Sequence, residues 1–468
     1  MQHNPFFSAV SSKDALTANG AVTNSTSQNF VLDLFFLAGA SRNIPESQLE
    51  TLLQKSYSQD PELTLKLIFW AGDIREGAGE RRFFRIALSF LDKYYPNVLQ
   101  KFIGFVPFYN RWDSLFHLNS AAALTLVDFA LRSGKNGLCA KWMPREGSKK
   151  FSSFRLAFRK KAELNDKQYR KLIAGLSKTV EQQMSAKQWD KIIYEHVPSV
   201  AMNKYRTAFY RNDEERFKNY IGAVTKGEKK INASAIFPHD IYKAVKRGHQ
   251  EEAVNAQWAA LPDYLKDSEE RILPVCDVSG SMNGDPMAIS VSLGIYLSER
   301  NKSIFKDGFI TFSMNPKLQR LIGSLTERMR QLEKAEWEQN TDLLKVFGLI
   351  LQRSLENKVP QDMMPTMLLI ISDMEFDATG NGQTNFEVMR DLYHKCGYIL
   401  PKIVFWNVNG RAGNIPVKVS DKGVALVSGA SPSIIKSILS GDINPAKVML
   451  NTLLKPRYEK ISLNSTNS

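Results

Sequence analysis

Short apolar runs of strand length recur through the C-terminal part of the chain, and amphipathic segments of helix length separate them. Five such runs predict strands at 271–277, 306–313, 366–373, 401–408 and 423–428, and a shorter run predicts another at 318–322. Helical spacing predicts helices at 286–300, 325–337, 341–357, 385–396, 431–439 and 445–454. Because apolar strands that alternate with helices form parallel sheets covered on both faces, we expect an α/β domain here.

The part before it, from about residue 30 to 250, has the pattern of successive helix pairs. Residues 30–38 and 63–71 are two of its apolar segments, and Pro61 suits the first turn of the second. No segment here gives a confident strand. The pairs share no fixed period, so we expect a degenerate HEAT-like α-helical array. The predicted fold class is therefore α plus α/β, with a Rossmann-like C-terminal domain.

These patterns divide the chain into four predicted regions, and 468 residues suffice for two or three domains. Residues 1–28 are polar and rich in Ser, Thr and Asn, which predicts a flexible N-terminal arm. Residues 29–268 form the helical part, and residues 269–458 form the α/β domain. Residues 459–468 are predicted to be a C-terminal tail.

Charge changes this picture, because the net charge of +14 is unevenly placed. Residues 101–250 carry 29 Lys and Arg against 13 Asp and Glu, whereas the segments on either side each have a net charge of −1. Such an asymmetry indicates a surface for a polyanion, most often a nucleic acid. The alternative is a solvated basic face without a partner. We expect RNA to be the ligand of the helical part.

Candidate RNA contacts come from turns that place Arg and Lys beside Trp and Tyr, since aromatic side chains stack on unpaired bases and cations hold phosphates. For any single Trp, a structural role as a staple between two helices is the better interpretation. For the basic residues as a set, RNA binding is the stronger one. The predicted contacts are Arg111, Lys141, Arg145, Lys149, Lys150, Arg155, Arg159, Lys160, Lys161, Lys204 and Arg206.

Polar side chains follow the first predicted strand of the α/β domain. The sequence Asp277-Val-Ser279-Gly-Ser281 comes directly after an apolar run that ends at Cys276. Open α/β sheets bind ligands at the carboxyl ends of their strands. One carboxylate and two hydroxyls provide too little charge for a tight Ca²⁺ cage, but they suit Mg²⁺, which keeps several waters.

Two further loops add to this edge of the predicted sheet. Thr341 stands at the start of a predicted helix, and Asp373 ends a central strand. Because the carboxyl ends of parallel strands share one edge, we expect three hydroxyls and two carboxylates to converge there. The alternative is that Ser279 and Ser281 only cap a helical turn. The predicted ligands of Mg²⁺ or another divalent cation are Asp277, Ser279, Ser281, Thr341 and Asp373.

This constellation resembles the metal-ion-dependent adhesion site of von Willebrand factor A-type domains. The resemblance implies that Ser279, Ser281 and Thr341 bind the cation directly or through water. It implies that the two Asp side chains either support these ligands or bind the cation directly. It also implies an open coordination position for a carboxylate of a partner protein. One departure is that Met374 and Glu375 follow Asp373, where many family members have Gly.

A basic HEAT-like array followed by an A-type domain is similar to the Ro autoantigen (TROVE-type) family. The local phrases look more like its less characterised relatives, and the resemblance covers roughly residues 30–455. They are Asp73-Ile-Arg-Glu-Gly-Ala-Gly-Glu-Arg-Arg82, Tyr109-Asn-Arg-Trp-Asp113, Lys141-Trp-Met-Pro-Arg145, Pro198-Ser-Val-Ala-Met202 and Ile236-Phe-Pro-His-Asp240. The family resemblance implies that the array closes into a ring. It also implies that small structured RNAs bind the outer surface and that single-stranded RNA ends enter the hole.

Other function classes find little support in the sequence. No apolar run is long enough to span a membrane, and the N-terminus lacks the pattern of a signal peptide. Three widely spaced Cys argue against disulfides and a Cys-rich zinc site, so we expect a reduced, cytoplasmic protein. Neither H-E-x-x-H nor G-x-S-x-G occurs, and the six His are dispersed.

Three hypotheses follow, in order of preference. The first is a non-enzymatic protein that binds small non-coding or misfolded RNA on its basic helical part and Mg²⁺ in its A-type domain. The second is an interaction scaffold that captures an acidic residue of a protein partner through the metal. The third and weakest is a metal-dependent nuclease or phosphatase, because only one metal site is evident and no general base is clearly placed.

Overall fold

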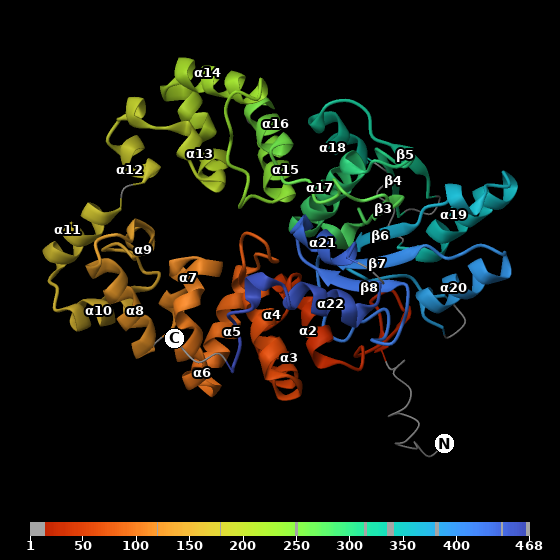
Figure 1. Cartoon of the computed structure of the whole chain (residues 1–468), viewed down its shortest axis with the longest axis horizontal. Coiled ribbons are helices and arrows are strands. Elements are labelled where there is room, and N and C mark those ends of the chain that lie inside the picture. The colour runs from red at the N-terminus through yellow and green to blue at the C-terminus, as the bar shows by residue number, and fades with distance from the viewer. Residues whose placement is uncertain are drawn as a thin grey trace.

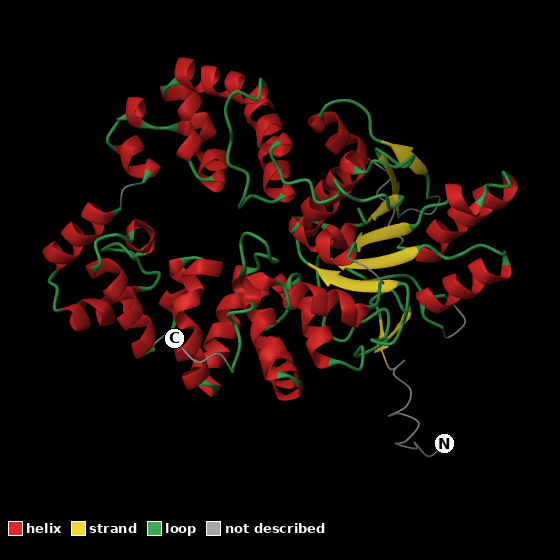
Figure 2. Cartoon of the chain, in the orientation of Figure 1, coloured by secondary structure: helices red, strands yellow, loops and turns green. Residues whose placement is uncertain are grey.

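The computed structural model of the chain describes residues 15–118, 120–177, 179–248, 251–312, 316–334, 341–379, 383–440 and 443–464. Its N-terminal part is a long succession of helices, and its C-terminal part is a sheet with helices around it (Figures 1 and 2). This arrangement confirms the predicted α plus α/β fold class. Within the described residues, no helix has the length and apolar character needed to cross a membrane.

The sheet has six strands in the order β5-β4-β3-β6-β7-β8. Five strands are parallel, and only the edge strand β5 is antiparallel to its neighbour. In the register, Val275 lies between Ile310 and Ile370, so the centre of the sheet is fully apolar. The strands are β3 (Ile272–Cys276), β4 (Gly308–Thr311), β5 (Leu318–Arg320), β6 (Met367–Ser372), β7 (Lys402–Asn407) and β8 (Val424–Ser428).

All six strands lie within the predicted ranges. Five of them are buried on both faces and therefore have bounded apolar sequences, whereas the edge strand β5 is partly exposed. Helix α17 packs on β3, β4 and β6, and helices α19 and α20 pack on each other beside the sheet. The helices of this part are α17 (Asp285–Arg300), α18 (Leu325–Lys334), α19 (Leu343–Glu356), α20 (Asn385–Lys395), α21 (Ile435–Ile438) and α22 (Pro445–Leu453). Residues 335–337 of the predicted helix 325–337 lie outside the described residues.

The helical part contains a chain of short helices with clear start signals. Asp60 accepts a hydrogen bond from the Leu63 amide and Pro61 opens the helix that follows, while Asn165 forms a capping box with Gln168. The helices are α2 (Phe30–Ala38), α3 (Glu46–Gln59), α4 (Pro61–Gly72), α5 (Arg81–Tyr94), α6 (Pro96–Phe102), α7 (Val106–Tyr109), α8 (Ala121–Arg132), α9 (Gly137–Trp142), α10 (Ser152–Ala162), α11 (Asp166–Leu176), α12 (Val180–Ser185), α13 (Ser199–Asn212), α14 (Glu214–Thr225), α15 (Pro238–Lys246) and α16 (Glu251–Ala259).

The buried apolar side chains form two clusters. The larger cluster runs from the first helices through the sheet without interruption, so the helical and α/β parts share one core. The smaller cluster is centred on α13 and α14, where it includes Phe209, Phe217 and Ile221, and extends to Val180 of α12 and Ala253 of α16. An ion pair of 2.9 Å joins Lys141 of α9, whose neighbour Ala140 belongs to the larger cluster, to Glu181 of α12, whose neighbour Val180 belongs to the smaller one.

The predicted helical part, residues 29–268, does not pack as a unit separate from the α/β domain. Helix α2 is the first helix of this part, but it lies against β8 and α22 and so covers the sheet. The Ser428 hydroxyl accepts a hydrogen bond from the Gly39 amide at 3.0 Å and donates one to the Phe35 carbonyl at 2.8 Å. A methyl group on Gly39 would lie 2.6 Å from the Ser428 carbonyl oxygen, so this close approach requires glycine.

The prediction of a flexible N-terminal arm is wrong for residues 15–28, while residues 1–14 lie outside the described residues. Strands β1 (Ala15–Leu16) and β2 (Val22–Thr23) form a small antiparallel hairpin. Thr23 and Asn24 then bond to the Ile415 backbone. The polar composition that predicted flexibility instead supplies the side chains that dock this segment on the α/β domain.

The predicted C-terminal tail is also packed as far as residue 464. Ile461 is fully buried, and Tyr458 lies under α4 with its hydroxyl 3.0 Å from Asp73. Arg457 forms an ion pair with the same buried Asp73. These contacts fasten the end of the chain to the first helices, because a buried carboxylate requires such partners. Residues 465–468 lie outside the described residues.

Both ends of the helical array contact loops at the carboxyl edge of the sheet. At the first end, the Ser433 hydroxyl donates to the Glu76 carbonyl at 3.0 Å. At the far end, α15 packs on α17, and Lys243 pairs with Asp285 at 2.6 Å. The ribbon in Figure 1 therefore makes a closed circuit, in which the α/β domain joins α2–α5 to α15 and α16.

Candidate metal centre and nucleic-acid interface

The loop after β3 brings the first three predicted ligands to the carboxyl edge of the sheet. Asp277 is fully buried, Ser279 is nearly so, and Ser281 is exposed. Asp277 accepts the Ser279 amide at 2.9 Å, which holds the loop in a tight turn. The Ser279 and Ser281 hydroxyls lie 3.1 Å apart. Neither hydroxyl caps a helix in the described residues, so the capping alternative finds no support here.

Asp373 comes to the same place from the end of β6. Its carboxylate accepts the Glu375 amide at 3.2 Å, and the neighbouring Ser372 hydroxyl donates to Asp277 at 2.6 Å. Burial raises the pKa of Asp277 to about 6, and the negative charge of Asp373 adds to this shift. The two carboxylates are therefore close enough to repel each other.

Thr341 precedes α19 and is almost fully buried. Its hydroxyl donates to the Glu375 carbonyl at 2.7 Å and lies 3.4 Å from Asp377. Thr341 is thus hydrogen-bonded to the loop that follows Asp373. Ser279 is hydrogen-bonded to Asp277, and Ser281 contacts Ser279. All five predicted ligands lie on loops at the carboxyl edge of the sheet. Asp277, Ser279 and Ser281 form one group and Thr341 belongs to another, and Glu375 connects Thr341 to Asp373 through its backbone.

The donor set fits a small divalent cation. Asp277 and Asp373 form no ion pair with any described residue, although both are buried, and a buried unpaired charge is costly. No group of three or more His, Cys, Asp and Glu among the described residues could hold a metal. A cation here would therefore depend on two carboxylates together with hydroxyls and water, which is the ligand set that Mg²⁺ accepts.

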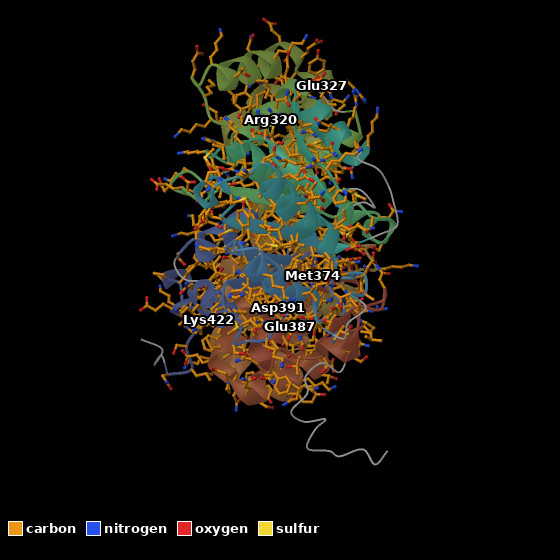
Figure 3. The ribbon with its side chains drawn as sticks, turned by 90° about the vertical axis from the view of Figure 1, so that its right-hand side faces the viewer. Arg320, Glu327, Met374, Glu387, Asp391 and Lys422 are labelled. Atoms are coloured by element: carbon orange, nitrogen blue, oxygen red, sulfur yellow. The ribbon has the colours of Figure 1, made fainter. Side chains whose placement is uncertain are left out.

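Position 374, where the resemblance to A-type domains leads one to expect Gly, has an unusual backbone conformation. Met374 adopts a left-handed backbone with φ of 66°, a conformation that glycine adopts more easily. Its side chain is buried, which compensates for the strain with apolar contacts. Figure 3 views the molecule from the side of the α/β part and labels Met374 together with Glu387 and Asp391 of α20. A non-glycine residue therefore makes the turn that follows Asp373.

The basic residues between α9 and the end of α10 are the exposed part of the predicted RNA contacts. Arg145, Lys149, Lys150, Lys160 and Lys161 are all exposed. The four lysines, which we call the lysine quartet, form no ion pair with another described residue. Helix α10 has 11 residues and is therefore about 16 Å long, with two lysines of the quartet just before its first turn and two in its last turn. Lys204 is also exposed but lies on α13, in the second cluster.

Three other predicted contacts are engaged within the protein. The Arg111 guanidinium lies 3.4 Å from the centre of the Trp142 ring and pairs with Asp113. Lys141 pairs with Glu181, and Arg159 pairs with Asp166. For Trp142 the structural interpretation is therefore the better one, since its face is covered by an arginine and not free for a base.

The prediction that Arg206 contacts RNA is wrong as a surface contact. Only 1% of Arg206 is exposed, because it lies on the side of α13 that faces the core. None of its three guanidinium nitrogens has a hydrogen-bond partner in the described structure. Burial and the charge of Arg247 lower its pKa to about 10. Arg155 is half-buried, and its Nε likewise lacks a partner.

Sequence reasoning missed one residue at the metal edge. Asn19, at the tip of the N-terminal hairpin, donates to the Thr341 hydroxyl at 2.8 Å and to the Glu375 carbonyl at 2.7 Å. No motif connects positions separated by 322 residues. The available signal was the turn sequence Thr17-Ala-Asn-Gly20, which predicts a hairpin but not its docking site.

Comparison with known proteins covers both parts of the chain. A family model described as "Domain of unknown function (DUF7788)" matches residues 271–456, and "Domain of unknown function (DUF2828)" matches residues 17–104 and 138–270. "Uncharacterized protein L728" of Acanthamoeba polyphaga mimivirus is 27% identical over 516 residues, which cover 96% of this chain and 89% of that protein.

Among solved structures, the crystal structure of the Deinococcus radiodurans RO (RSR) protein matches 94% of this chain and 95% of its own, with 15% identity and a TM-score of 0.37. The two family models meet at residues 270 and 271, where the helical array gives way to the α/β domain. The chain is thus similar to the viral protein over nearly its full length, and more distantly to a bacterial Ro protein.

Proposed function

We propose that this protein is a non-enzymatic RNA-binding protein of the Ro-like kind. Its helical part holds small structured RNA or single-stranded RNA ends, and its α/β domain binds Mg²⁺ or another divalent cation. The observation that carries the RNA proposal is the lysine quartet, which is exposed and free of acidic partners among the described residues. Phosphates are the natural partners of such a group, since they neutralise it without requiring a specific base sequence.

The RNA is expected to be held mainly through its phosphates. Trp142 is covered by Arg111, and Trp112 is buried, so these rings are not free for stacking. Phosphate contacts fix the position of a nucleic acid but carry little sequence information. We therefore expect binding that is strong at low salt and only weakly selective for sequence.

The cation has a supporting role in this proposal. Asp277, Asp373 and the hydroxyls of Ser279, Ser281 and Thr341 would hold it, and its positive charge would relieve the repulsion between the two buried carboxylates. The loop that carries Ser281 leads directly into α17, whose first residue Asp285 pairs with Lys243 of α15. A bound cation would thus stabilise the contact that closes the helical circuit.

The test is RNA affinity measured by fluorescence anisotropy at low salt, with a labelled single-stranded RNA and a labelled stem-loop. A variant in which Lys149, Lys150, Lys160 and Lys161 are all changed to Glu should bind at least about ten-fold more weakly. The matched control changes four exposed lysines of the α/β domain to Glu, and these are Lys306, Lys358, Lys395 and Lys422. Both variants have the same net charge, so an equal loss in both would contradict a localised RNA surface.

A further inference from the structure

The N-terminal hairpin ends in a tight turn that lies on the candidate metal edge. Residues 17–20 make this turn, in which the Gly20 amide donates to the Thr17 carbonyl at 3.0 Å and Gly20 has a φ of 82°. The Thr17 hydroxyl donates to the Phe376 carbonyl at 2.7 Å. Gly20 also forms a β-bridge with Asp377. The hairpin tip is therefore docked on residues 375–377, which follow Asp373.

Glu375 is part of this docking. Its carboxylate accepts the Ala18 amide, and it lies 3.3 Å from both Arg411 and the Asn414 side chain. These three contacts hold the Glu375 carboxylate next to the N-terminal hairpin. Glu375 is an extra acid relative to the family pattern, and its contacts show what it does in this chain: it receives the N-terminal hairpin.

The hydroxyl of Thr341 lies between the hairpin and this loop. A hydroxyl has one hydrogen to donate and two lone pairs to offer. The hydrogen is donated to the Glu375 carbonyl, and one lone pair accepts the Asn19 side-chain amide. The other lone pair remains for a cation, and the hydroxyl can no longer rotate. Asn19 also donates to the Glu375 carbonyl, so one side chain fixes both partners.

We propose that Asn19 is a positioning residue of the metal centre, supplied by the N-terminal hairpin. It orients the Thr341 hydroxyl so that a lone pair is presented to the cation, and residues 15–24 act as a strap that completes the site. This inference rests on the proposed cation binding. Groups that orient metal ligands typically change metal affinity by about 10- to 100-fold when they are removed.

The experiment is a titration with Mn²⁺, with free ion counted by electron paramagnetic resonance, on the full-length protein. Asn19→Ala should weaken Mn²⁺ binding about 10-fold. Leu16→Ala is the matched control, because Leu16 belongs to the same hairpin, is 66% exposed and is not among the residues docked at the metal edge. Thermal unfolding in EDTA should be the same for both variants, which shows that the loss concerns the site and not the fold.

A double-mutant cycle shows whether Asn19 acts through Thr341. In a Thr341→Ala background, Asn19→Ala should cause no further loss of Mn²⁺ affinity. An equal loss in both backgrounds, or an Asn19→Ala variant with wild-type affinity, would overturn the positioning role while leaving the metal centre in place. A wild-type protein that binds no Mn²⁺ would overturn both the metal centre and this inference. In that case the titrations of the wild type and of Asp277→Ala, which lacks a predicted ligand, would be the same.

Discussion

Asp277 and Asp373 are the residues whose environment most directly calls for a cation. Both are buried, neither forms an ion pair with a described residue, and their proximity contributes to the raised pKa of Asp277. Sequence spacing alone predicted this pair, because an Asp after each of two parallel strands must lie on the same edge. The sequence could not show how the Thr341 hydroxyl is oriented, since that depends on Asn19 of the distant hairpin.

Changing Asp373 to Asn should therefore have opposite effects with and without metal. In EDTA, the amide removes the repulsion with Asp277 and should stabilise the fold by about 1 kcal/mol. In Mg²⁺, the wild type should gain about 3 kcal/mol when the ion is at 100 times its Kd, and the variant should gain none. Thermal unfolding in the two buffers measures both effects. A variant that is less stable than wild type in EDTA would contradict the proposed repulsion.

Arg206 shows the limit of sequence reasoning at this scale. It stands among basic and aromatic residues, which is the pattern of an RNA contact, but its position on α13 turns it into the core. Helical spacing does place Arg206 on the buried face of α13, four residues after Met202 and three before Phe209. The prediction instead followed its charge, since a basic residue beside aromatic ones is usually exposed.

The unpaired Arg206 guanidinium should cost the folded state free energy. Arg206→Met keeps a similar volume without the charge, so it should raise the free energy of unfolding by about 1–3 kcal/mol. Urea unfolding followed by circular dichroism measures this change. RNA affinity should stay the same, since the side chain is not on the surface. A destabilised variant would mean that Arg206 has a buried partner, such as a bound anion.

At the scale of elements, the strands were the most predictable feature. Each strand but the edge strand β5 is a short run of apolar residues bounded by polar ones, and together with its length this pattern indicates a strand that is buried on both faces. The N-terminal hairpin was missed because its strands have two residues each and mostly polar neighbours. The role of α2 was missed for another reason. Its apolar sequence indicates that it is buried, but it does not show that the surface it packs against is β8.

The contact between α2 and β8 gives a prediction at this scale. Gly39→Ala would place a methyl group 2.6 Å from the Ser428 carbonyl, so α2 must shift, at a cost of about 1–3 kcal/mol. The control is Gly222→Ala on α14, where no atom lies within 4 Å and the gain should be about 0.5–1 kcal/mol. Chemical unfolding monitored by circular dichroism and by tryptophan fluorescence measures both. An unchanged Gly39→Ala variant would contradict the close packing of α2 on the sheet.

At the scale of the whole molecule, the chain is one circuit rather than two separate domains. The first helices are fastened to the α/β domain by α2 and by the pair of Asp73 with Arg457, and the last helices are fastened by α15 on α17. The basic surface lies on the arc between these two attachments. The sequence predicted the parts and their order. The attachment of both ends of the helical array to the α/β domain could not be predicted, because it depends on contacts between residues far apart in the sequence.

RNA binding by this arc is the central claim, and the dependence of affinity on salt tests it most directly. For single-stranded RNA, the logarithm of the association constant should fall linearly with the logarithm of salt concentration, by about 0.7 for each phosphate neutralised. Loss of the lysine quartet should make the slope shallower by about 3, while the control with four changed lysines in the α/β domain should keep the wild-type slope. A slope near zero for the wild type, or the same slope in all three proteins, would contradict the account.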